Sequence, residues 1–105
     1  MSAAPPVDVG PVAEFPAGAA RRVRVANRDV AVFHIDGAFY AVKDACPHQG
    51  DPLSRGRLDG CAVVCPGHDW VFDLRTGQCT GGGGLGARLS AFPVSVVAGR
   101  VRVTP

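Results

Sequence analysis

The sequence predicts an all-β domain, a sandwich or partial barrel of stacked antiparallel sheets. Three observations favour this class. Apolar and polar residues alternate in several short runs, Gly and Pro residues separate these runs, and no run has the periodicity of a helix of three turns. The chain contains 14 Gly and 9 Pro among its 105 residues. This length is typical of one domain, so we expect residues 1–105 to form a single unit.

The N-terminal half is expected to begin with a loose arm and to continue with antiparallel strands. Residues 1–11 are rich in Ala and Pro and are assigned to the arm. Residues 21–27 alternate charged and apolar side chains, which suits a half-buried strand. Asp36–Gly37 is typical of a two-residue hairpin turn, so a strand is expected on each side of it. These strands are residues 29–36, with Ala31, Phe33 and Ile35 on one face, and residues 38–43.

Shorter strands are expected in the C-terminal half, where turns are more frequent. In order, the sequence predicts a short apolar strand over 62–64, a strand–turn–strand unit over 70–79 with its turn at 75–77, a Gly-rich loop over 80–87, and a closing hairpin over 92–105 that turns near Ala98 and Gly99.

Charge and composition exclude several classes of function. The formal net charge of +2 is small and the Arg residues are dispersed, which argues against nucleic-acid binding. No apolar run approaches the roughly 18 residues that span a membrane, and the first residues lack the pattern of a signal peptide. We therefore expect a cytoplasmic protein. In a reducing compartment, four cysteines favour metal or redox chemistry over disulfides.

Two turns each carry a cysteine and a histidine. The segment ACPHQGDPLS contains Cys46 and His48, and VCPGHDW contains Cys65 and His68. Pro follows each cysteine and fixes φ, while nearby glycines let the backbone pass close to a bulky inorganic centre. Two thiolates and two imidazoles suit a tetrahedral zinc site or a [2Fe–2S] cluster with mixed ligands. Structural zinc usually takes both cysteines from one turn, so one cysteine and one histidine per turn favours the cluster.

The segment CPHQGDPL…CPGHDWVFDLRTGQC resembles the Rieske [2Fe–2S] signature. Over about residues 12–104 the chain is similar to soluble Rieske-type ferredoxins and to the small subunits of assimilatory nitrite reductases. The resemblance implies a Rieske fold with one [2Fe–2S] cluster per chain. The order of strands and turns predicts a compact insertion at about residues 44–78, which would carry both Cys/His turns. The ligands that it implies are Cys46 and Cys65 for the buried iron, and His48 and His68 for the outer iron.

The chain departs from the family pattern at several positions. Family ferredoxins commonly have Trp and Gly around the second histidine, where this chain has Gly67 and Asp69. The run Gly81–Gly84 stands where the family often has a proline that shields the cluster. High-potential Rieske proteins have Ser and Tyr at the positions of Trp70 and Phe72. Without those donors, we expect a potential at the low end of the Rieske range, about −150 mV.

The remaining cysteines and histidine have structural interpretations. Respiratory Rieske proteins bridge their cluster loops with a disulfide at the positions of Asp51 and Gly67, so no such bridge can form here. Cys61 and Cys79 are expected to be reduced thiols in or near the core. His34 is expected to be an ordinary strand residue. A single extra histidine cannot build the two-histidine, one-carboxylate iron site of a Rieske oxygenase.

The expected function is electron transfer and not catalysis. The spacing G-x-G-x-x-G occurs at Gly81, Gly83 and Gly86, but no helix pattern follows it and there is no room for a dinucleotide domain. We therefore expect the electrons to come from another protein. A Rieske-type ferredoxin would take one electron from a flavin-dependent reductase and pass it to a terminal enzyme such as a ring-hydroxylating oxygenase. One alternative is the small subunit of a nitrite reductase-like complex. Another, from a different class, is a zinc-stabilised interaction module.

Overall fold

The computed structural model describes residues 5–47, 49–67, 69–84 and 86–105. Within these ranges the chain forms short strands and two 3₁₀ turns, η1 (Val12–Glu14) and η2 (Leu53–Arg55), which confirms the all-β fold class. The strands are β1 (Val7–Pro11), β2 (Ala19–Val25), β3 (Arg28–Ile35), β4 (Ala38–Lys43), β5 (Arg57–Asp59), β6 (Ala62–Val64), β7 (Val71–Asp73), β8 (Cys79–Gly81), β9 (Ala91–Phe92), β10 (Val94–Val97) and β11 (Arg100–Val103). No helical segment of the described ranges is long and apolar enough to cross a membrane.

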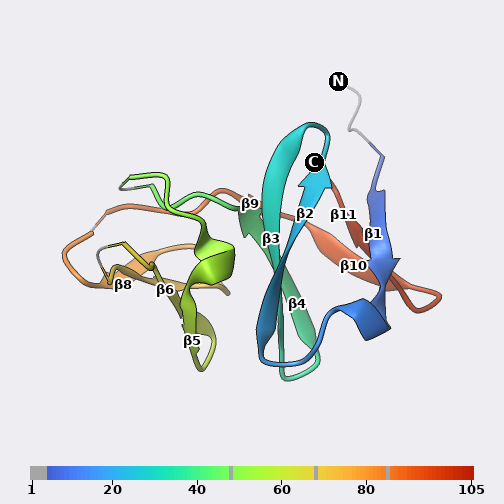
Figure 1. Cartoon of the computed structure of the whole chain (residues 1–105), viewed down its shortest axis with the longest axis horizontal. Helices are drawn as coiled ribbons and strands as arrows, with labels where there is room; N and C mark the ends of the chain where they lie inside the picture. The colour runs from blue at the N-terminus through green and yellow to red at the C-terminus, as the bar shows by residue number, and fades with distance from the viewer. Residues whose placement is uncertain (1–4, 48, 68, 85) are drawn as a thin grey trace.

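The strands form three antiparallel sheets. A middle sheet has the order β2-β3-β4-β9, a second sheet has the order β1-β11-β10, and a third has the order β5-β6-β7-β8. Figure 1 shows the middle sheet between the other two, with the β5–β8 sheet at one end of the molecule. Because the chain leaves the middle sheet after β4 and returns to it at β9, residues 44–90 form an insertion that contains the whole β5–β8 sheet. This insertion is longer than the one expected at about residues 44–78, since β8 also belongs to its sheet.

Strand β3 is buried on both of its faces. Ala31, Phe33 and Ile35 belong to a core shared with the insertion, which confirms that these three residues lie on one face. Val30 and Val32, on the opposite face, belong to a second core beneath the β1–β11–β10 sheet. The middle sheet therefore separates two apolar cores, since neighbouring strand residues point to opposite faces.

The prediction of a loose arm is wrong for residues 7–11. These residues form β1, which pairs with β11 in an antiparallel register that sets Val7 opposite Val103. Asp8 and Arg100 form an ion pair across the two strands, with Nε and Oδ2 2.9 Å apart. The hydrogen bond from Arg100 lowers the pKa of the Asp8 carboxyl. The first strand of the chain was not predicted because its partner strand lies at the other end of the sequence.

Several strand boundaries also differ from the expected ones. Strand β2 begins at Ala19, earlier than expected, and β5 (Arg57–Asp59) was not predicted. The predicted closing hairpin is confirmed for β10 and β11, with Ala98 and Gly99 at positive φ in the turn. Phe92 instead pairs with Ala41 of the middle sheet, so the expected hairpin segment begins in a different sheet.

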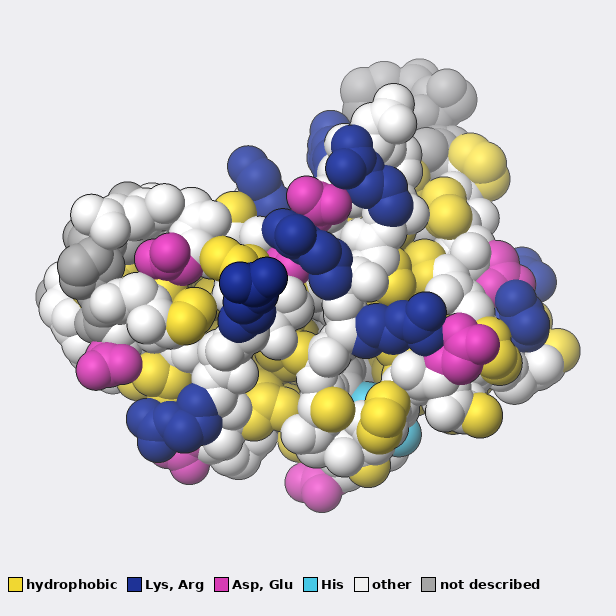
Figure 2. Space-filling view, viewed as in Figure 1, with side chains coloured by type: hydrophobic (Ala, Val, Ile, Leu, Met, Phe, Trp, Pro, Cys, Tyr) yellow, Lys and Arg dark blue, Asp and Glu magenta, His cyan; other side chains and the backbone are white. Residues whose placement is uncertain are grey.

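Charged side chains are spread over the surface. Figure 2 shows Lys and Arg side chains at separate places on one face, several of them beside acidic groups. Arg21 pairs with Glu14, and Arg75 pairs with Asp73. These ion pairs place opposite charges side by side at the surface.

Candidate metal centre

Both Cys/His turns lie in the insertion. The first turn leaves β4 and runs to η2, and the second connects β6 to β7. Both lie toward the end of the molecule formed by the β5–β8 sheet (Figure 1). His48 and His68 lie outside the described residues, so the structure locates the two turns through Cys46, Cys65 and their neighbours.

Main-chain hydrogen bonds close the first turn. The N–H of Cys46 donates to the carbonyl of Asp51 at 2.8 Å, and the N–H of Gly50 donates to the carbonyl of Cys46 at 2.8 Å. Gly50 has a φ of 77°, in the left-handed region that glycine adopts without strain. The cysteine therefore uses both of its own peptide groups to close a six-residue loop.

The second turn repeats this pattern. The N–H of Cys65 donates to the carbonyl of Trp70 at 2.7 Å, and the N–H of Asp69 donates to the carbonyl of Cys65 at 3.1 Å. Asp69 stands four residues after its cysteine, as Gly50 does, and has a φ of 58°. Aspartate tolerates the left-handed conformation better than most residues. Although the histidine is spaced differently in the two turns, the backbone closes around both cysteines with the same bonds.

Both cysteines are buried in one core. Cys46 is 2% exposed and Cys65 is 1% exposed, and both belong to the same apolar cluster as Leu53 and Phe72. By contrast, residues near the tips of the turns are exposed: Pro47, Gln49, Pro66, Gly67 and Asp69. The arrangement thus places two thiols on the buried side of turns whose tips face water, and two thiols suit a metal centre with soft ligands.

The two turns touch each other at Asp51 and Gly67. A Cβ atom at Gly67 would overlap the carboxylate of Asp51, so only glycine leaves room for this side chain. These are the two positions at which the resemblance implies a bridging disulfide in respiratory Rieske proteins. Here a carboxylate packed against a glycine occupies the place of that covalent link.

The Gly-rich segment packs against the second turn. A Cβ at Gly82 would come within 2.7 Å of Trp70 Cα, and a Cβ at Gly84 would overlap the Trp70 indole ring. Gly84 is buried, although sequence analysis assigned this segment only to a loop. The sequence signal for this contact is the run of four glycines in a chain with a single tryptophan, since close approach to a large ring is one reason for glycine.

Cys61 and Cys79 do not form a disulfide and lie in or near the core, as expected. The Cys61 thiol donates to the Tyr40 hydroxyl at 3.4 Å, and the Cys79 thiol donates to the carbonyl of Gly81 at 3.1 Å. The hydrogen bond with Cys61, aided by burial, raises the pKa of Tyr40. These contacts give both thiols a structural role.

His34 also has a structural role. Its Nδ1 lies 2.7 Å from the carbonyl oxygen of Phe15, so this nitrogen carries the proton and donates. The ring stacks on Phe39 with centroids 4.3 Å apart. This agrees with the expectation that His34 is an ordinary strand residue.

We predict that Gly84→Ala moves the Gly-rich segment away from Trp70. The added methyl group would overlap the indole ring, so the ring should become more exposed. Because the chain has one tryptophan, a red shift of its emission and faster acrylamide quenching report this movement directly. Thr80→Ala, at an exposed position of the same segment, serves as the control. Unchanged emission and quenching in Gly84→Ala would contradict the packing described here.

The chain is similar to ferredoxins of dioxygenase systems and to a protein described as a nitrite reductase small subunit. It is 42% identical over 96 residues to the 3-phenylpropionate/cinnamic acid dioxygenase ferredoxin subunit of Photorhabdus laumondii subsp. laumondii, covering 89% of this chain and 88% of that protein. A chain in the complex of reduced oxygenase and oxidized ferredoxin in carbazole 1,9a-dioxygenase superimposes with a TM-score of 0.86 and 34% identity, covering 93% and 91%. A protein described as a nitrite reductase NADPH small subunit gives a TM-score of 0.82 and 25% identity, covering 96% and 99%.

The comparisons also decide between the two inorganic centres that the ligand set leaves open. Residues 5–93 match the Rieske [2Fe–2S] domain, so the cofactor is a [2Fe–2S] cluster and not zinc. Because this match spans most of the sequence and includes both cysteine turns, the chain belongs to the Rieske [2Fe–2S] domain family.

Proposed function

We propose that the chain is a one-electron carrier in which Cys46 and Cys65 ligate one iron of the cluster, and His48 and His68 ligate the other. The observation that carries this proposal is the burial of both cysteines in one core, on turns that close with the same hydrogen bonds. A [2Fe–2S] cluster accepts and returns one electron. The two turns hold it at one end of the molecule, and their exposed tips form the surface at which electrons enter and leave.

The rest of the chain supports a carrier and not an enzyme. Beyond the two turns, the sequence contains one histidine, His34, and it is bonded to a main-chain carbonyl. The likeness to the ferredoxin subunit, at 42% identity, covers 89% of this chain and 88% of that protein. Its reaction partners are therefore other proteins, and we place it in the cytoplasm with them.

We propose a flavin-dependent reductase as the electron donor and a terminal Rieske oxygenase as the acceptor. The likeness to a chain from a complex of oxygenase and ferredoxin supports this acceptor. The exposed tips of both turns, including Pro47 and Pro66, offer a docking surface within a few residues of the buried cysteines. A short distance between cluster and surface is what an exchanging carrier requires.

A second candidate is the small subunit of a nitrite reductase-like complex, which the fold likeness to such a subunit favours. The two candidates differ in how firmly the chain binds a larger protein. We expect affinity-tagged chain, purified from its native host at physiological salt, to be recovered without a stoichiometric large subunit. We also expect the isolated holoprotein to be reduced by a flavin-dependent ferredoxin reductase with NADH. Recovery of a large partner subunit at a one-to-one ratio would favour the second candidate.

The ligand assignment predicts two irons and two inorganic sulfides per chain. Cys65→Ser and His68→Ala should abolish the visible absorption of the cluster and lower thermal stability, because the cluster links two turns of the same core. Cys61→Ser and Cys79→Ser, which change thiols outside the proposed ligand set, should retain both irons. One zinc and no labile sulfide in protein made under iron-replete conditions would contradict the assignment.

The apolar surroundings predict a low reduction potential. Reduction adds negative charge at the sulfurs, so nearby hydrogen-bond donors raise the potential, and Phe72 provides no side-chain donor. We expect a wild-type potential of about −150 mV. Phe72→Tyr should raise it by roughly tens of millivolts, since one net hydrogen bond contributes about 1 kcal/mol and ~59 mV corresponds to about 1.4 kcal/mol for one electron.

Protein-film voltammetry measures this shift. Phe72 is completely buried in the core that holds both cysteines, whereas Phe92 packs against the opposite core. Phe92→Tyr is therefore the matched control and should leave the potential unchanged. A wild-type potential well above zero would contradict the expectation of few donors around the sulfurs.

A further inference from the structure

Asp44 lies two residues before Cys46, at the point where the chain leaves β4. Its side chain is 0% exposed. Among the residues that the structure describes, Asp44 is the single charged residue that is buried. A buried carboxylate is costly unless hydrogen bonds or an opposite charge compensate for lost water. The contacts of Asp44 therefore show what this carboxylate holds in place.

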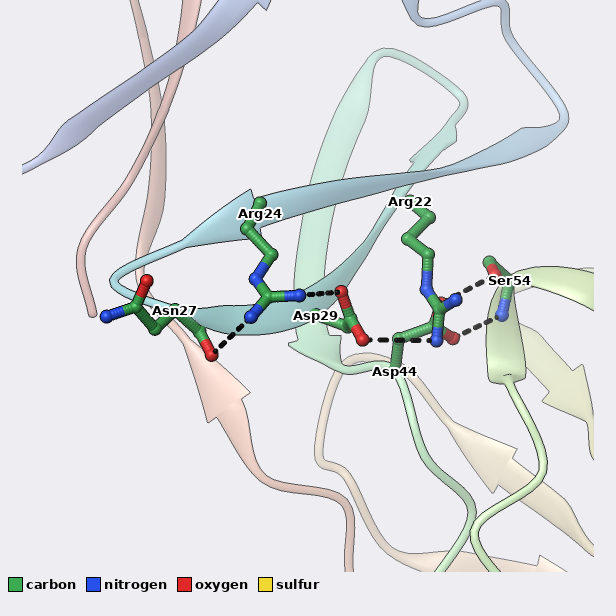
Figure 3. A network of polar contacts seen from close by, with 6 residues as sticks. All are labelled: Arg22, Arg24, Asn27, Asp29, Asp44 and Ser54. Carbon is green, nitrogen blue, oxygen red and sulfur yellow. Dashed lines mark hydrogen bonds and ion pairs between the residues drawn. The ribbon is translucent and has the colours of Figure 1, made fainter.

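Three donors meet this carboxylate, and two of them come from Ser54. The main-chain N–H of Ser54 donates to Oδ1 at 2.7 Å, and the Ser54 hydroxyl donates to Oδ2 at 2.6 Å. The third donor is Nε of Arg22, 2.8 Å from Oδ2. Figure 3 shows the Asp44 carboxylate between Arg22 on one side and Ser54 on the other.

The contact between Asp44 and Ser54 spans the first ligand turn. Asp44 precedes the turn, and Ser54 lies in η2, which follows it. Inside this span, the N–H of Cys46 closes the turn on the carbonyl of Asp51. The turn is thus closed twice, by its own backbone within and by one carboxylate across its ends.

Arg22 connects this closure to the middle sheet. It lies on β2 and also contacts Asp29 of β3 at 3.4 Å, which in turn contacts Arg24 at 3.4 Å. The N–H of Asp44 donates to the carbonyl of Asp29 at 2.9 Å. A chain of polar contacts therefore runs from β2 and β3 to η2 of the insertion (Figure 3).

We propose that Asp44 is a positioning residue for the metal centre. Through Ser54 and Arg22 it fixes the ends of the first turn to the middle sheet, and so fixes Cys46 relative to Cys65 on the second turn. The second turn is closed by its own backbone bonds. Among the described residues, the bonds of the Asp44 carboxylate go to Ser54 and Arg22 instead. Loss of Asp44 should loosen one turn and leave the other closed. This inference rests on the proposed ligand role of Cys46 and Cys65.

The experiment compares Asp44→Ala, Asp44→Asn and Ser54→Ala in the protein as isolated. Groups that support metal ligands typically change metal affinity about ten- to a hundredfold when they are removed. We expect Asp44→Ala to lose iron to a chelator faster than the wild type by a factor of about this size. Its EPR signal, recorded in the reduced state, should broaden because the ligands adopt a range of positions. Asp44→Asn and Ser54→Ala each keep part of the hydrogen bonding. Their rates of iron loss and their EPR line widths should therefore lie between those of the wild type and of Asp44→Ala. If Asp44→Ala does not fold, Ser54→Ala still tests the proposal, because it removes one hydroxyl and keeps the main-chain bond.

Val101→Ala separates positioning from general stability. Val101 is completely buried in the core on the other side of the middle sheet, so this variant should lower the melting temperature without changing chelation or the EPR signal. Equal acceleration of iron loss in Val101→Ala and Ser54→Ala would overturn the proposal. It would also be overturned if Asp44→Ala, Asp44→Asn and Ser54→Ala all lost iron at the wild-type rate and gave the wild-type EPR signal.

Amide exchange tests the same proposal independently of the bound group. In Ser54→Ala, the Cys46 and Gly50 amides should exchange faster, while the Cys65 and Asp69 amides should exchange as in the wild type. An equal change in both turns, or in neither, would overturn the positioning role. A separate result would contradict the proposed function: a wild-type protein that contains neither iron nor inorganic sulfide.

Discussion

The main-chain closure around each cysteine is the constraint on which the site depends. In both turns the cysteine donates its N–H to the residue five places on and accepts from the residue four places on. Local bonds of this kind fix the shape of each turn but not the distance between the turns. That distance depends on longer contacts: Asp51 against Gly67 between the turns, and Asp44 with Arg22 between the first turn and the middle sheet.

The sheets provide the rigid body that these contacts need. Strand β3 is buried on both faces. One face of the middle sheet packs against the insertion, and the other face packs against the β1–β11–β10 sheet. The ion pair between Asp44 and Arg22 differs from this packing, because the Asp44 side chain is 0% exposed whereas the Arg22 side chain is 49% exposed. Water screens the exposed guanidinium, so this pair should contribute less to stability than a fully buried one. We infer that the pair specifies a geometry, and that the apolar cores supply most of the stability.

Local sequence patterns predicted the local structure. Asp36–Gly37 has positive φ at both positions, as a two-residue hairpin turn requires, and the strands on either side are where alternation predicted them. Contacts between distant segments left no such pattern. The Asp8–Arg100 pair joins residues 92 positions apart. The glycines beside Trp70 have the sequence pattern of an open loop, and only the structure shows that they pack against the indole ring. Within the site, the two cysteine turns were predicted from residue types, while their shared closure depends on backbone geometry. The assignment of His48 and His68 as ligands stays a prediction.

The departures from the family pattern preserve this backbone geometry and change the exposed surface. Gly67 replaces a commonly larger residue, and the Asp51 carboxylate occupies the space beside it. Asp69 replaces a common glycine but keeps the left-handed φ of 58° that the fourth position of the turn adopts. It thereby adds a carboxylate to the exposed tip of the second turn. Since an exposed charge acts on approaching proteins more than on the fold, these substitutions alter the surface that a partner meets. The closure of the turn uses main-chain atoms, and the same two bonds form around Cys46 and Cys65, so the side chains at positions 67 and 69 change the surface of the turn and not its backbone.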